Sequence, residues 1–246
     1  MGLPPPLKKL QCQCLPTCRA TPLKNSPFCA KHLKSCPRVS PLSGYEPAYE
    51  PDRWNNVKEL RETHNCFAYA FNIHDPKQVE ACRKDPECNT PFHQPGSASG
   101  HPRFRGARLK TCPDMIARLL GDNPSLKMTT FETKCPSHTS KIALVVDPDE
   151  DYHFYRQDKN SYWSHKPGGT AVTNKDASGR LIYDPALAAR NYTDKDSTLD
   201  YDTFCGYFCL ARDKPLHIKV GGYRKTRRSV RKGRHTRSAR RASNHF

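Results

Sequence analysis

Three residues of the sequence have the chemistry and the order that a thiol hydrolase requires: Cys66, His153 and His165. Cys66 follows Asn65 and opens the apolar run FAYAF. Its thiol is therefore expected in the first turn of a helix, where unpaired N–H groups and the helix dipole favour a thiolate. His153 and His165 lie twelve positions apart in DYHFYRQDKNSYWSH, a strand–turn–strand pattern. Taken singly, each is more often a structural residue, but together they predict a nucleophile (Cys66), a base (His153) and an orienting group (His165).

A second group of reactive side chains lies near the N-terminus. The pattern C-x3-C-x10-C-x2-H offers four ligands at spacings that suit tetrahedral zinc: Cys14, Cys18, Cys29 and His32. Cys12 is an alternative to Cys14, and Cys36 is a spare thiol. This segment has too little apolar surface for a core of its own, so a structural zinc ion is expected to supply its folding energy. The competing interpretation is a disordered cysteine-rich leader.

The elements that must position these residues follow from periodicity and from helix start and stop signals. Helices are expected over residues 64–73, 76–84 and 111–124, with a short one over 185–192. Strands are expected over residues 141–147, 151–157, 161–165, 179–185 and 204–212. Helices that precede an antiparallel sheet indicate an α+β fold. Alternation along 151–157 places His153 on a polar strand face, able to meet a thiol.

The order of these parts resembles the NlpC-type papain-like cysteine peptidases and amidases. The motifs that carry the resemblance are HNCFAYA, with Cys66, and HFYRQDKNSYWSH, with His153 and His165, over roughly residues 55–170. The resemblance implies a papain-like domain in which a helix precedes the sheet, with a peptide or protein substrate. The bulky residues after His153 and the extended WSHKPGG segment depart from the family pattern. They leave open whether His153 or His165 is the base.

Charge and composition divide the chain into four parts. The formal net charge is +17, and all of the excess lies in the two ends of the chain. We expect a zinc module over residues 1–40, a linker over 41–55, the hydrolase domain over 56–222 and a disordered basic tail over 223–246. The tail has too few apolar residues to fold alone. It is expected to bind nucleic acid by counterion release, with a solvated tail or a localisation signal as the alternative.

The expected location follows from what the N-terminal sequence lacks. No apolar run reaches the length of a membrane span, and residues 1–11 lack the apolar core of a secretion signal. The twelve cysteines are therefore expected to be reduced. Other Cys/His groups follow no metal spacing and are expected to be structural: Cys82, Cys88 and His93; Cys135 and His138; Cys205 and Cys209. The location expected is intracellular, in a host cytoplasm or nucleus, or in a virion.

Two functions of different classes remain. The first is a cysteine peptidase or amidase that cleaves an amide or isopeptide bond through Cys66. The second is a non-enzymatic structural component of a virion or nucleoprotein that binds nucleic acid through its basic ends. The ends of the chain resemble those of proteins from large DNA viruses of protists. The loops over residues 93–110 and 166–180 would set substrate specificity.

Overall fold

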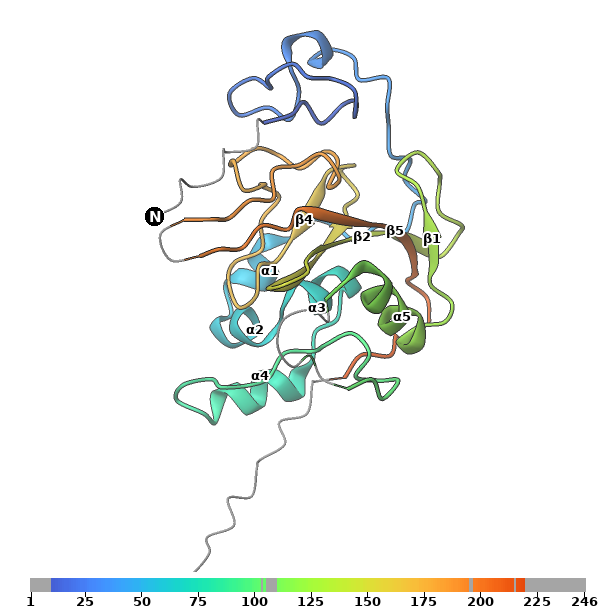
Figure 1. Cartoon of the computed structure of the whole chain (residues 1–246). Helices are drawn as coiled ribbons and strands as arrows, with labels where there is room; N and C mark the ends of the chain where they lie inside the picture. Colours follow the sequence, from blue (N-terminus) through green and yellow to red (C-terminus); the bar gives the residue numbers. More distant parts are fainter. Residues whose placement is uncertain (1–9, 103, 105–109, 195–196, 215, 220–246) are drawn as a thin grey trace, which may run out of the picture.

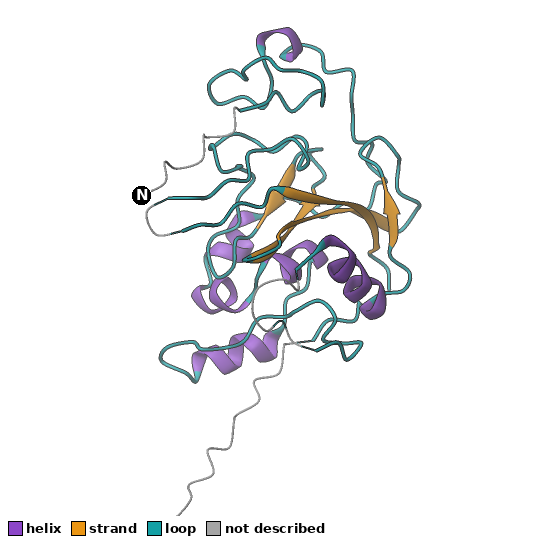
Figure 2. Ribbon diagram, in the orientation of Figure 1, coloured by secondary structure: helices purple, strands orange, loops and turns teal. Residues whose placement is uncertain are grey.

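The computed structural model describes residues 10–102, 104, 110–194, 197–214 and 216–219. In this part of the chain, a five-stranded antiparallel sheet has helices on one face (Figures 1 and 2). The sheet order is β1-β5-β2-β3-β4. The strand bounds are β1 Lys127–Thr129, β2 Thr139–Asp147, β3 Asp151–Gln157, β4 Trp163–His165 and β5 Thr203–Ala211. This confirms the α+β class and the antiparallel sheet.

Three of the helices begin at a residue whose side chain caps them. The helices are α1 Pro51–Asn55, α2 Lys58–Thr63, α3 Cys66–Phe71, α4 Pro76–Arg83 and α5 Cys112–Asp122, with a 3-10 turn at Ala30–His32. Asn65 accepts a hydrogen bond from the backbone N–H of Ala68 at the start of α3. Asp75 and Thr111 cap α4 and α5 in the same way. Polar cap residues before apolar runs explain why these three helices were predictable.

The two faces of the sheet are buried by different parts of the chain. On one face, α3 and α5 pack against the side chains of Tyr152, Phe154 and the alternate residues of β2. On the other face, Tyr155 and Trp163 pack with Ile182 and Tyr201 from the long segment between β4 and β5. Because both faces are covered, β2 is buried along nearly its whole length. Its continuous apolar sequence reflects this burial.

Four disulfide bonds connect the described residues: Cys14–Cys36, Cys82–Cys88, Cys112–Cys205 and Cys135–Cys209. The last two attach β5 to α5 and to the loop that follows β1. The expectation that all cysteines are reduced is therefore wrong. It was based on the N-terminal sequence, whereas pairing depends on which cysteines the fold brings together.

Other differences lie in short segments. Residues 41–55, expected to be a linker, contain α1, and Trp54 is buried against the domain. Residues 179–185 form isolated bridges, through Leu181 and Ile182, instead of a regular strand. Residues 185–192 form turns instead of a helix. The expected tail over 223–246 lies outside the described residues.

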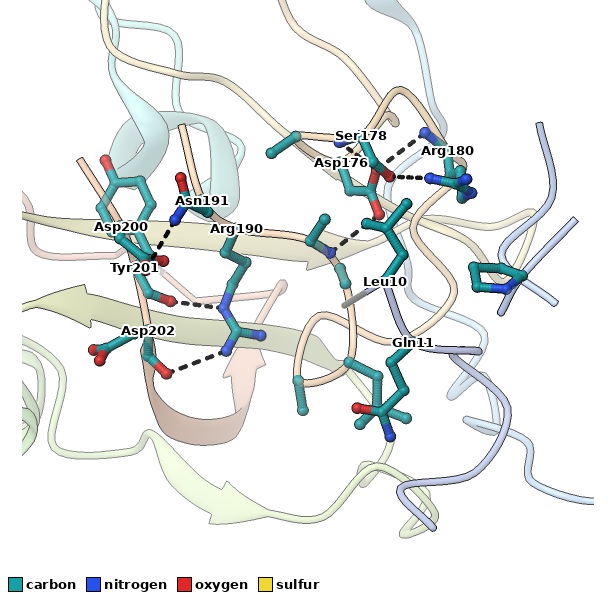
Figure 3. A pocket seen from close by; sticks show the side chains of 16 residues that line it. Leu10, Gln11, Asp176, Ser178, Arg180, Arg190, Asn191, Asp200, Tyr201 and Asp202 are labelled. Atoms are coloured by element: carbon teal, nitrogen blue, oxygen red, sulfur yellow. Dashed lines mark hydrogen bonds between the residues drawn. The ribbon is translucent and has the colours of Figure 1, made fainter. Parts of the chain in front are cut away.

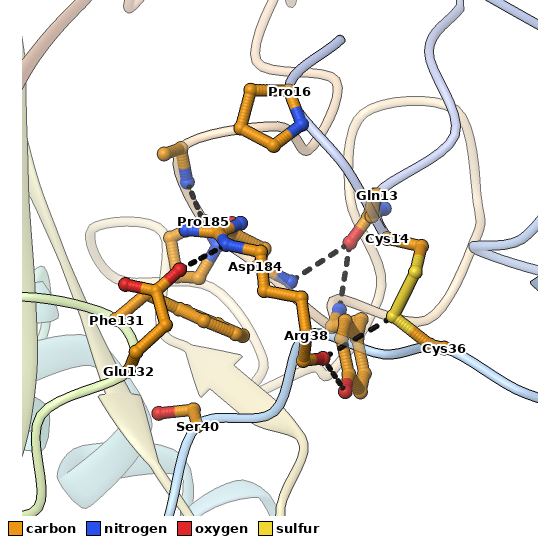
Figure 4. Close-up of polar contacts among 12 residues, drawn as sticks. Gln13, Cys14, Pro16, Cys36, Arg38, Ser40, Phe131, Glu132, Asp184 and Pro185 are labelled. Carbon is orange, nitrogen blue, oxygen red and sulfur yellow. Dashed lines mark hydrogen bonds and ion pairs between the residues drawn. A yellow bond between two sulfur atoms is a disulfide. The ribbon is translucent and has the colours of Figure 1, made fainter. Parts of the chain in front are cut away.

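The N-terminal segment packs on the domain through Gln13, as Figure 4 shows. The side-chain Oε1 atom of Gln13 accepts hydrogen bonds from the backbone N–H groups of Tyr183 (2.7 Å) and Asp184 (3.1 Å). The guanidinium of Arg38 forms ion pairs with the carboxylates of Asp184 and Glu132. The Asp184 carboxylate is fully buried, and a buried charge of this kind needs such a partner. The segment is therefore anchored to the domain by specific polar contacts.

Candidate functional site

Cys66 lies at the start of α3, as predicted, and contacts β3. Its side chain packs with Phe67, Tyr152 and Phe154 in the core between α3 and the sheet. The Sγ atom lies 3.9 Å from the carbonyl oxygen of Tyr152, the residue before His153. Asn65, which caps the helix, also donates from Nδ2 to the carbonyl oxygen of His93 at 2.9 Å. The Asn65 side chain thus connects the start of α3 both to the helix backbone, at Ala68, and to the segment that contains His93.

His153 and His165 meet across β3 and β4. The Nε2 atom of His153 lies 2.7 Å from the Nδ1 atom of His165, and both rings are buried. On its other side, His165 Nε2 lies 2.8 Å from the backbone carbonyl oxygen of Lys175. The predicted pairing of the two imidazoles is confirmed.

The Lys175 carbonyl determines the tautomer of both rings. A carbonyl only accepts, so His165 carries its proton on Nε2, and its Nδ1 is then the acceptor when the ring is neutral. His153 must therefore donate from Nε2 to His165 Nδ1. This leaves the lone pair of His153 on Nδ1. In this arrangement His165 orients His153, and His153 is the ring that has a basic nitrogen available for a further partner.

The thiol and the imidazole pair are not joined by a hydrogen bond among the described residues. His153 projects from the face of β3 opposite α3, where it contacts the rings of Tyr155 and Tyr201. Burial raises the pKa of the Cys66 thiol, and the nearby Asp151 carboxylate raises it further. Burial, and then the neighbouring His165, lowers the pKa of His153. All three groups are therefore neutral in this conformation. The expectation that His153 faces the thiol is wrong, because the thiol and the imidazole pair lie on opposite faces of the sheet.

The N-terminal segment brings four possible metal ligands together: Cys12, Cys18, Cys29 and His32. Their ligand atoms all lie within 4.8 Å of one another. The Sγ atoms of Cys18 and Cys29 are 3.8 Å apart, and His32 Nδ1 lies 3.4 Å from Cys12 Sγ and 3.5 Å from Cys29 Sγ. A tetrahedral zinc ion with ordinary bond lengths needs sulfur–sulfur edges of about 3.8 Å and sulfur–nitrogen edges of about 3.5 Å. The cluster fits a metal ion of that geometry.

The assignment of Cys14 as a metal ligand is wrong. Cys14 is bonded to Cys36, the residue expected to be spare, and Cys12 occupies its place in the cluster. Both thiols satisfy the spacing rule, since they are two positions apart. Only the path of the chain decides which one reaches His32. The other three predicted ligands, Cys18, Cys29 and His32, are brought together as predicted.

Some residues of these sites have no signal in the sequence. The Lys175 carbonyl that fixes the His165 tautomer is a backbone group, so its residue type is irrelevant. Tyr201 contacts His153 from the segment before β5, far away in the sequence. The further Cys/His groups are occupied by disulfides, since Cys82 pairs with Cys88. Cys205 and Cys209 pair with other partners, Cys112 and Cys135.

Comparison with known proteins identifies one relative. The chain is 39% identical over 148 residues to insoluble matrix shell protein 1 of Ruditapes philippinarum, a match that spans 59% of this chain and 84% of that protein. No family model and no solved structure matches the chain. None of the helices among the described residues is long and apolar enough to cross a bilayer. The identity and the coverage of the relative show that this chain belongs to the family of insoluble matrix shell protein 1.

Proposed function

We propose that the protein is a structural component of an extracellular matrix, stabilised by disulfides. The observation that carries this proposal is the set of four disulfides, two of which join cysteines 93 and 74 positions apart in the sequence. Disulfides of this kind persist in oxidising compartments. The name of the relative, a matrix shell protein, supports the same location. The proposal replaces the intracellular or virion location expected from the sequence.

Alkylation before and after reduction tests this proposal. Tissue that expresses the chain is treated with a membrane-permeant alkylating reagent, and the chain is then extracted, reduced and labelled with a second reagent. We expect the second label on the eight cysteines of the four disulfides and recovery of the chain in the insoluble extracellular fraction. A cytosolic chain that carries the first label on all twelve cysteines would overturn the proposal.

The metal cluster is assigned to zinc within the same proposal. Three thiolates and one imidazole are soft to borderline ligands, and a closed tetrahedral set is typical of a structural zinc site. Zinc would hold residues 12–32 together and so keep Gln13 in position to contact the domain at Tyr183 and Asp184. The ion would have a structural role, because all four positions around it are filled by side chains.

A second candidate function is the thiol hydrolase, in a papain-like domain. One observation in its favour is the chain of hydrogen bonds from the Lys175 carbonyl through His165 to His153, which leaves Nδ1 of His153 as the basic nitrogen. Another is the contact of Cys66 with β3, the strand that carries His153. In this function Cys66 attacks an amide carbonyl and His153 takes the thiol proton. In this structure Cys66 and the His153 ring lie on opposite faces of the sheet, so the reaction would require β3 or the start of α3 to rearrange before the thiol could reach Nδ1 of His153.

The reactivity of Cys66 tests the second candidate. A hydrolase requires Cys66 in the folded, metal-loaded protein to react with iodoacetamide at pH 6.5 faster than free cysteine. His153→Ala should slow this reaction at least tenfold. His138→Gln is the matched control, because His138 is exposed and its ring packs against Tyr45 instead of the pair. Labelling of Cys66 only in denaturant would exclude the hydrolase and leave the structural role intact.

A further inference from the structure

Two asparagines of the sequence are followed, two positions later, by serine or threonine. They occur in Asn123-Pro124-Ser125 and Asn191-Tyr192-Thr193. Proline at the middle position excludes the first from N-glycosylation, whereas the second is a full acceptor sequence. Such a sequence has a meaning only in a chain that enters the secretory pathway, which the disulfides also indicate. The local structure at Asn191 decides whether a folded chain can carry a sugar there.

Asn191 lies in a surface turn that holds its amide in one orientation. Its Oδ1 accepts a hydrogen bond from the backbone N–H of Thr193 at 2.9 Å, and its Nδ2 donates to a carboxylate oxygen of Asp200 at 3.2 Å. This is an Asx turn within the acceptor sequence. The primary amide has two N–H bonds, and one of them satisfies Asp200. A sugar that replaces the other hydrogen leaves both existing hydrogen bonds intact.

The surroundings of Asn191 have room for a carbohydrate. The side chain is partly exposed, and that of Thr193 is exposed. Asn191 lines a cavity of about 430 Å³ at the junction of the N-terminal segment with the domain, where Leu10 and Gln11 face the 176–191 segment (Figure 3). By contrast, Asn123 is buried, with its amide bonded to the backbone of His217. The two asparagines thus differ in exposure as well as in sequence.

We propose that Asn191 is an N-glycosylation site and carries an asparagine-linked oligosaccharide. The donor is a polyprenyl pyrophosphate-linked oligosaccharide, the class of molecule that such transfers use. Nδ2 of Asn191 forms a bond to the anomeric carbon of the sugar. The bond from that carbon to the pyrophosphate oxygen breaks, the lipid pyrophosphate leaves with the electron pair, and one Nδ2 proton is released. This inference rests on the proposed extracellular function, because the transfer takes place during secretion.

The site is tested on the full chain, expressed behind a cleavable secretion leader in cultured eukaryotic cells. The intact mass of the leader-cleaved chain is measured before and after peptide-N-glycosidase, both in the medium and in the cell extract. We expect a glycan mass that the enzyme removes with conversion of Asn191 to aspartate. N191Q and T193V should each abolish it, and T193S should retain it, because serine also completes the acceptor sequence. T193V leaves the Asn191 amide unchanged, so it separates loss of the acceptor from loss of folding.

The outcomes separate this site from the proposed function. A leader-cleaved chain with four disulfides and no enzyme-sensitive mass would overturn the glycosylation site while the matrix role stands. The same mass in T193V and in the original chain would also overturn it. A glycosylated chain whose cysteines are all reduced would support the site and overturn the disulfide-stabilised extracellular role.

Discussion

At the scale of single residues, two cysteines that are two positions apart have different roles: one is a candidate metal ligand and the other forms a disulfide. Cys12 and Cys14 share the same segment, yet Cys12 lies 3.4 Å from His32 Nδ1 and Cys14 is bonded to Cys36. A buried thiol cluster beside disulfides would itself be open to oxidation. A bound metal ion keeps such sulfurs as thiolates and in place. Metal binding and disulfide bonding therefore have separate residues in the N-terminal segment.

Metal content distinguishes these two roles. We expect purified protein to contain about one zinc ion per chain and C12S to lose it, because serine is a poor ligand in place of a thiolate. The double variant C14S/C36S should keep the ion and lose only the disulfide. The metal is measured by elemental mass spectrometry after gel filtration. Zinc retained in C12S and lost in C14S/C36S would reverse the assignment.

At the scale of elements, β5 is held in place both by hydrogen bonds to its neighbouring strands and by disulfide bonds. It pairs with β1 and with β2, and its two disulfides link it to Cys112 and Cys135. Gly206 interrupts the strand with a φ of +143°, where a Cβ would approach the Met128 side chain at 3.3 Å. Glycine is suited to this position because side chains disfavour that conformation. The β-bulge between Leu144 and Val145 lies opposite this point.

The two disulfide loops of very different length should differ in their contribution to stability. Cross-linking restricts the unfolded chain more when the closed loop is longer. Removing Cys112–Cys205, with a sequence separation of 93, should lower the free energy of unfolding by about 4 to 5 kcal/mol. Removing Cys82–Cys88, with a separation of 6, should lower it by about 2 kcal/mol.

Urea denaturation of C112A/C205A and C82A/C88A measures both values under non-reducing conditions. The short-loop variant is the control for a general effect of losing a disulfide. An equal loss in the two variants, or a larger one for the short loop, would contradict the chain-entropy explanation.

At the scale of the whole molecule, several imidazoles are buried in the neutral form. Burial lowers the pKa of His64, His74 and His165 to about 4. The neighbouring rings of His93 and His74 lower the pKa of His64 further. The guanidinium of Arg53 has the same effect on the pKa of His74. The Nδ1 atom of His93 and the Nε2 atom of His74 are buried without a hydrogen-bond partner among the described residues. Protonation of His74 or His93 would add a proton to a ring that has one buried nitrogen without a hydrogen-bond partner among the described residues. The folded state therefore disfavours proton uptake by these rings.

Acidification should destabilise the protein between about pH 6.5 and pH 4. The unfolded imidazoles bind protons below 6.5, and the folded ones do so only near 4, so stability is complete above 6.5 and is lost as pH falls through this window. A fully buried ring such as His165 contributes up to roughly 3 kcal/mol, and the half-buried His74 contributes less because solvent screens its charge. The buried carboxyls of Asp151, Asp158 and Asp184, whose pKa values burial raises, act in the opposite direction at lower pH.

Denaturant unfolding at pH 7.5, 6 and 5 measures this dependence. H64Q should flatten it, and H138Q, at an exposed position, should leave it unchanged. Stability that is independent of pH over this range would contradict neutral burial of these rings.

Much of the local structure could be predicted because its causes are local. Asn65, Asp75 and Thr111 cap three helices, and the apolar run of β2 predicts a strand buried on both faces. The pairing of His153 with His165 also follows from a short strand–turn–strand pattern. In contrast, the turns over residues 179–192 have regular-looking sequences, but their contacts with Gln13 and with β4 override the local preference.

By itself, the sequence determined the chemical inventory: a thiol at a helix start, two imidazoles on adjacent strands, a Cys/His metal pattern and one glycosylation acceptor. The tertiary structure alone decided which of these groups meet. It paired eight cysteines, substituted Cys12 for Cys14, and placed the His153 ring and α3 on opposite faces of the sheet. The physical reason is that bonds between side chains depend on distance in space, and residues far apart in the sequence become neighbours only when the sheet and its two cores form.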